Sequence, residues 1–244
     1  MKLQLNVITE NNIDPDSNFE IHPDILEYLT VIANRTITAH ERDPERFINK
    51  DLPEGNVDAI NLVICGREYF KTLFPEPKNQ DALGIFMTST PDDDPFDDGT
   101  VYPNHATVYF VYEESFLKEC FDSAIILREF KSDLEAYFAT IPHEIHHALL
   151  FLENANFHSP QDCQMFGDVY DFITGYGIRP LTIRDQQVWS DTADEAGQDI
   201  ESYVEEKALN IMQYDDTCYR MVSLIADHLE DQFSASPSVR TPQT

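Results

Sequence analysis

The five residues HEIHH, at positions 143–147, hold three of the chain's eight histidines. On an α-helix, His143 and His147 lie one turn apart and about 40° around the axis, so both imidazoles can reach one metal ion. Glu144 lies beside them, where it can take a proton from a water on the metal without binding the metal itself. The pattern predicts a catalytic Zn²⁺ site with His143 and His147 as ligands and Glu144 as general base.

The residues around this pattern favour a continuous helix with one apolar face. His146 borders the ligand face, but only the pairing of His143 with His147 places Glu144 correctly. We therefore expect His146 to lie behind the ligands or to face solvent. The apolar face is expected from five residues: Ile145, Ala148, Leu149, Leu150 and Leu152.

A catalytic zinc needs a third protein ligand, and several candidates are open. Glu153 lies where some metallopeptidases carry a third ligand, but that geometry needs a glycine turn and Leu150 stands there instead. His158 follows the end of the helix and would have to fold back. Glu201 and Glu205 are one turn apart on a later predicted helix. We expect this helix to supply the ligand, with Glu201 ahead of Glu205.

The arrangement resembles the gluzincin-type zinc metallopeptidases, in which an H-E-x-x-H helix faces a later helix that bears a glutamate ligand. The residues that carry the resemblance are HEIHH and, at 201–205, ESYVE. No subfamily is identified, because the chain lacks the N-E-x-x-S-D or E-x-x-A-D string of the best-known members. The resemblance implies that Glu201 completes the zinc site and that the substrate is a protein or peptide.

Hydrolysis of a peptide bond also needs a hydrogen-bond donor that stabilises the oxyanion. His158, Tyr170 and Tyr203 are candidates on residue type. We expect Tyr176 in this role, because the glycines on both sides of it in TGYGIRP allow a loop in which it is exposed.

Strand patterns come early in the chain and helical patterns late, which predicts an α+β fold. We expect a zincin-like arrangement, with a small mixed sheet in the N-terminal half and the 143–147 helix in a helix-rich C-terminal half. The strand at 106–112 is the expected sheet edge along which a peptide would lie. The expected strands are 61–66, 82–90 and 106–114, with the last two paired, and the expected helices are 24–35, 67–74, 115–155, 191–212 and 217–233.

Two local signals refine the helical half. Ser132 and Glu135 fit a capping box for a helix that begins near Asp133. Pro142 is expected to start a fresh helix or to kink an existing one. We expect one metallopeptidase-like domain over 1–234, followed by a flexible tail over 235–244.

The chain carries 45 acidic and 16 basic residues, for a net charge of −29. Such a surface repels phosphate backbones, so we expect no direct nucleic-acid binding and a preference for a basic substrate or partner. The alternative function is a non-catalytic acidic binding or inhibitor protein that retains a zincin fold, and an inhibitor that mimics DNA is one version of it. The acidic loop 91–99 does not follow EF-hand spacing, and calcium binding there is left open.

Acidic and polar residues occur too close to the start of the chain for a secretory signal. The apolar runs of the chain are too short to cross a bilayer. We therefore expect a cytoplasmic protein without membrane contact, and leave open secretion of an effector by a route that uses no signal peptide. The four cysteines are widely spaced, which predicts free thiols: Cys65, Cys120, Cys163 and Cys218.

Overall fold

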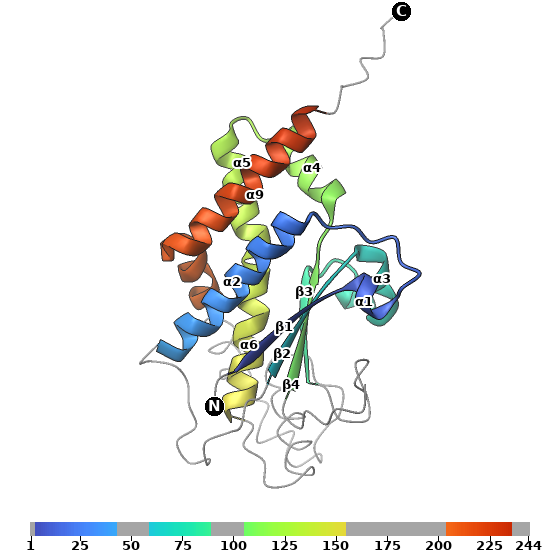
Figure 1. Ribbon diagram of the computed structural model, residues 1–244, viewed down its shortest axis with the longest axis vertical. Helices are drawn as coiled ribbons and strands as arrows, with labels where there is room; N and C mark the ends of the chain where they lie inside the picture. The colour runs from blue at the N-terminus through green and yellow to red at the C-terminus, as the bar shows by residue number, and fades with distance from the viewer. Residues whose placement is uncertain (1–2, 43–58, 89–104, 155–203, 236–244) are drawn as a thin grey trace, which may run out of the picture.

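A computed structural model describes residues 3–42, 59–88, 105–154 and 204–235 (Figure 1). In chain order the elements are β1 (Gln4–Thr9), α1 (Glu10–Ile13), α2 (Pro23–Arg42), β2 (Ala59–Cys65), α3 (Arg67–Leu73), η1 (Pro77–Asn79), β3 (Gly84–Thr88), β4 (His105–Val111), α4 (Glu114–Ser123), α5 (Leu127–Phe138), α6 (Thr140–Asn154) and α9 (Asp216–Ala235). Residues 204–214 form a further helix before α9. The predicted mixture of helices with a small sheet is confirmed. None of the described helices is long and apolar enough to cross a membrane.

The sheet has four strands in the order β1-β2-β4-β3. β1, β2 and β4 are parallel, and β3 runs antiparallel to β4 at the edge. The expected pairing of the third and fourth strands is therefore confirmed. The expectation that 106–112 forms the sheet edge is wrong, because β4 has a partner on both sides. β1 was not expected, since its short polar-interrupted sequence QLNVIT carries a weak strand pattern.

Both faces of the sheet are covered, so β2 is buried along its whole length. Ile60, Leu62 and Ile64 face the larger core, which also receives side chains from α2, α5, α6 and α9. Val63 and Cys65 face a smaller cluster formed with α3. Figure 1 shows the two groups of helices on opposite sides of the sheet. Burial on both faces explains why this strand reads as a continuous apolar run rather than an alternating one.

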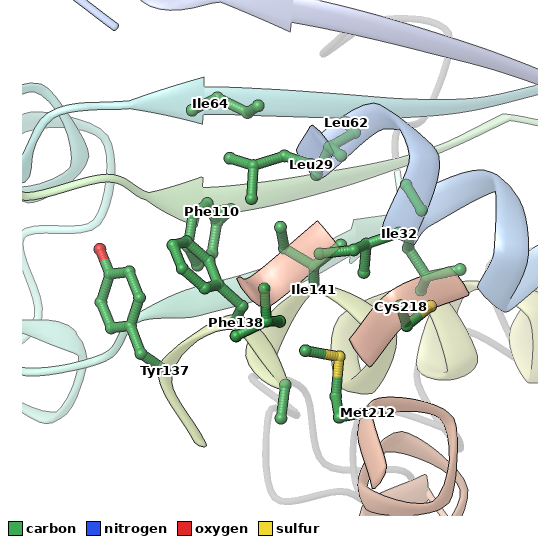
Figure 2. Packing of buried hydrophobic residues seen from close by; sticks show 14 of the residues in the cluster. Leu29, Ile32, Leu62, Ile64, Phe110, Tyr137, Phe138, Ile141, Met212 and Cys218 are labelled. Carbon is green, nitrogen blue, oxygen red and sulfur yellow. The ribbon is translucent and has the colours of Figure 1, made fainter. Parts of the chain in front are cut away.

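The larger core joins segments that are far apart in the chain. Figure 2 shows side chains from α2, the sheet and α6 gathered with Met212 and Cys218 from the C-terminal segment. Leu29 of α2 and Ile141 of α6 have no exposed surface, and Met212 has almost none. Burial of apolar side chains such as these contributes about 1.5–3 kcal/mol each. The packing therefore holds α6 against both the sheet and α2.

The helical stretch expected from Ser115 is divided into three helices. The expected capping box at Ser132 and Glu135 is wrong, because α5 already begins at Leu127 and both residues lie inside it. The Ser132 hydroxyl donates to the carbonyl of Arg128, four residues earlier, as serine does within a helix. Pro142 lies in the first turn of α6, where its missing N–H costs no helical hydrogen bond. The expected fresh start near Pro142 is confirmed.

An ion pair joins α2 to the start of α9. The Arg35 guanidinium binds Asp215, and its Nε lies 3.1 Å from one carboxylate oxygen. The other carboxylate oxygen of Asp215 accepts from the N–H groups of Thr217 and Cys218, both at 3.0 Å, and so caps α9. Burial opposes ionisation of Asp215, but these hydrogen bonds outweigh it and lower the pKa of the carboxyl. The charged form of Asp215 therefore stabilises the fold.

We predict that Asp215→Asn lowers the free energy of unfolding by about 1–2 kcal/mol at neutral pH, since asparagine keeps the cap but loses the charge. The folded pKa lies below the unfolded one, so this contribution is present above the unfolded pKa and is lost as pH falls through the folded pKa. Urea unfolding of both proteins should show the difference shrinking between about pH 7 and about pH 3. Asp216→Asn, at the exposed neighbouring position, is the control. A difference that stays constant with pH would contradict the prediction.

Candidate metal centre

His143 and His147 lie on α6 with their rings turned toward each other. Their Nε2 atoms are 3.1 Å apart, and the ring centroids are 4.8 Å apart at an interplanar angle of 68°. Two nitrogens that bind one zinc at about 2.0–2.1 Å in tetrahedral geometry lie about 3.3 Å from each other. The two Nε2 atoms thus lie within hydrogen-bond distance of each other, and their separation is close to that of two ligands on one zinc.

Glu144 is placed on a neighbouring flank of α6, against the edge strand β3. Its side chain is 5% exposed, while His147 is 1% exposed and His143 is half-buried. A Cβ at Gly84 of β3 would lie 2.9 Å from Cγ of Glu144 and 2.6 Å from Cγ2 of Thr140. Only glycine leaves room for so close an approach of helix and strand. The carboxylate of Glu144 thus belongs to a mostly buried site beside the sheet edge.

His146 faces a different side of α6 and is 2% exposed. The alternative that it faces solvent is therefore wrong. Its Nδ1 lies 2.7 Å from the carbonyl oxygen of Pro142, which can only accept, so Nδ1 carries the proton. Its ring also meets that of His40 on α2 at 5.6 Å. Burial, followed by the neighbouring His40, lowers the pKa of His146 to about 3, which keeps its imidazole neutral.

His40 was not singled out from the sequence. It ends the apolar stripe of α2 and is 2% exposed. Its spacing in the sequence could have indicated its burial, because His40 continues at helical intervals the apolar stripe of Ala33 and Ile37. A polar residue in such a position is buried only when a neighbouring element accommodates it, and here α6 does so.

The described residues do not supply a third metal ligand beside His143 and His147. Among the side chains that the structure describes, no third His, Cys, Asp or Glu brings a ligand atom within 4.8 Å of both His143 and His147. Glu205 is exposed on the helix over 204–214. His146 and Glu205 therefore do not complete the site in this arrangement.

The other candidates lie where the structure does not describe them. Glu201, His158 and Tyr176 fall outside the described residues, as do Tyr170, Tyr203, Cys163 and the acidic loop 91–99. The side chain of Glu153 is likewise not described. α6 does continue to Asn154 without a turn after His147, as the sequence predicts from Leu150. Cys65, Cys120 and Cys218 are free thiols, as expected.

Comparisons with protein-family models, with curated proteins and with solved structures found no match to this chain. The chemistry of the site is therefore judged from its own residues. Two imidazole nitrogens that converge, with a buried carboxylate on the next flank of the same helix, suit a borderline metal such as Zn²⁺ better than Ca²⁺ or Mg²⁺, which prefer oxygen ligands.

We predict that Gly84→Ala lowers the free energy of unfolding by about 1–3 kcal/mol, because the added methyl group would overlap Thr140 and Glu144. Chemical denaturation of the purified variant measures the change. Gly66→Ala is the matched control: a Cβ there would meet its nearest neighbours, Glu10 and Phe19, at an ordinary 3.4 Å. Equal losses in the two variants would show that the α6–β3 approach is not tight.

Proposed function

We propose that this protein is a zinc-dependent metallopeptidase in which His143 and His147 bind the metal and Glu144 is the general base. The proposal is carried by the approach of the two Nε2 atoms to 3.1 Å on one face of α6. That separation fits two ligands of a tetrahedral zinc. Zinc, when bound, supplies Lewis acidity toward a water molecule and toward the oxygen of the scissile carbonyl.

We assign the role of general base to Glu144, and its burial and place on α6 support this. It follows His143 directly on α6, and its Cγ lies against Gly84 of β3. Its carboxylate would accept the proton of the attacking water and pass it to the leaving amine nitrogen. A buried carboxylate that does not bind the metal keeps this capacity, whereas a ligand would not. Tyr176 is our proposed donor to the oxyanion.

The edge strand β3 offers a place for an extended substrate. Among the described strands, β3 pairs only with β4, so its outer side can accept a peptide backbone by strand addition. Gly84, at the start of β3, touches Glu144, which brings the base next to this edge. An antiparallel edge strand beside an H-E-x-x-H helix is the zincin-like arrangement that we propose for the fold. The net charge of −29 favours a basic protein or peptide as substrate through long-range attraction.

We propose Glu201 as the third ligand. Val204, Ala208 and Ile211 are buried along one face of the helix over 204–214, as their spacing predicts. In the sequence, Glu201 comes seven residues before the buried Ala208, which is the spacing of two turns of an ideal helix, whereas Glu205 is exposed. Sequence spacing thus favours Glu201 over Glu205.

We predict that the full chain binds zinc and that Glu144→Gln lowers its peptidase rate by about 10²–10⁴-fold with the metal retained. Glutamine has the size of glutamate but cannot take the proton. Hydrolysis of basic, unstructured histone-tail peptides, together with metal analysis, measures both quantities. Glu119→Gln, an exposed position on α4, is the control.

The alternative non-catalytic function gives a different result. A chain that binds no zinc at His143 and His147, or whose Glu144→Gln variant is as active as the unmodified protein, would contradict the peptidase. Tight binding to a basic protein without cleavage would then favour the acidic binding protein.

We predict that Glu201→Gln weakens zinc binding about tenfold or more, whereas Glu205→Gln leaves it unchanged, because only Glu201 is expected to supply an anionic ligand. Competition with a chromophoric chelator measures the affinity. Circular dichroism checks that each variant is folded. Weaker binding in Glu205→Gln alone would transfer the ligand role to that residue.

A further inference from the structure

A second group of metal-ligating side chains lies at the other end of α2. His22, Asp24 and His228 each offer one ligand atom, and these three atoms lie within 4.8 Å of one another. The rings of His22 and His228 approach to 4.1 Å between centroids, at an angle of 48°. No other group of three or more His, Cys, Asp or Glu side chains in the described part of the chain meets this condition.

The three residues come from two packed helices. His22 immediately precedes α2, Asp24 lies in its first turn, and His228 lies in the second half of α9. They line, or lie beside, an open pocket of about 880 Å³ that Asp231 and Glu20 also line. Two imidazoles and the carboxyl groups of Glu20 and Asp231 thus share the wall of a pocket that is otherwise largely apolar. Such a setting attracts a cation.

We propose that His22, Asp24 and His228 form a second site for a divalent transition-metal ion, which ties the start of α2 to α9. Two imidazoles and one carboxylate suit Zn²⁺, Ni²⁺ or Cu²⁺, whereas Mg²⁺ and Ca²⁺ require mainly oxygen ligands. Water can fill the remaining coordination positions from the open side of the pocket. Asp231, one helical turn from His228, is available as a further ligand or as a partner of a bound water.

His22 can offer its Nδ1 to the metal at small cost. That nitrogen accepts a hydrogen bond from the N–H of Asp24 at 3.3 Å, which is long for such a bond. It also lies 3.9 Å from the nearer carboxylate oxygen of Asp24, slightly wider than two ligands of one metal require. Both side chains are about half exposed, at 47% and 57%, so small rotations bring the ligands together.

This second site is separate from the one on α6. His40, whose ring contacts His146 beside the first site, ends the same helix that His22 precedes. At 1.5 Å per residue, the positions of His22 and His40 are about 27 Å apart along the helix. No residue is shared, so one site can be removed while the other is kept.

Zinc titration of the full chain tests the inference. We expect the unmodified protein to bind one more Zn²⁺ per chain than the variant His22→Asn/His228→Gln, and expect added zinc to raise the melting temperature less in the variant. Asparagine at position 22 keeps a cap for the start of α2, so the variant should fold. Equilibrium dialysis with metal analysis gives the stoichiometry.

The test does not depend on the proposed peptidase. If the α6 site binds no zinc, the unmodified chain should bind one ion and the His22→Asn/His228→Gln variant none. At the second site, Asp24→Asn should weaken zinc binding about tenfold, because it removes the anionic ligand. Glu27→Gln makes the same charge change one turn later on α2 and should leave zinc binding unchanged. Equal zinc stoichiometry in the variant and the unmodified chain, or equal loss in Asp24→Asn and Glu27→Gln, would overturn the second site.

Discussion

The close approach of α6 to the edge of the sheet is the contact on which the site depends. Gly84 leaves the space that Thr140 and Glu144 occupy, so one flank of α6 is held against β3. The opposite flank carries His146, which packs on His40 of α2. Viewed down the axis of an α-helix, positions 143 and 147 lie between positions 144 and 146. Contacts on both flanks therefore fix the rotation of α6 and hold the two imidazoles together between them.

Much of this arrangement could be predicted from the sequence because it depends on local periodicity. Ile141, Ile145 and Ala148 mark the buried face of α6 at helical spacing, and all three are fully buried. The i, i+4 spacing of His143 and His147 likewise requires only a helix for their rings to meet. Where one element's own geometry decides the outcome, residue type and spacing were sufficient.

The errors concern contacts between elements. The β-rich sequence of 106–112 could not show that β3 would take the outer position, because strand order is set by how the whole sheet packs. Ser132 has the residue type of an N-cap, yet α5 begins a turn and a half earlier, since the buried Phe130 extends its apolar stripe. The burial of His146 depends on His40, a residue more than a hundred positions away. No local pattern carries that information.

Helix α2 connects the two ends of the helical layer. Its buried stripe, from Ile25 to Ile37, packs between the sheet, α6 and α9, so this helix contributes to the core along its whole length. One end contacts α6 through His40, and the other brings His22 to His228. A ligand that binds only the folded chain at either end stabilises the same packing, by an amount that depends on its concentration relative to its dissociation constant. A metal at His22 would therefore reinforce the helix that positions α6 without touching the residues that would carry out the chemistry.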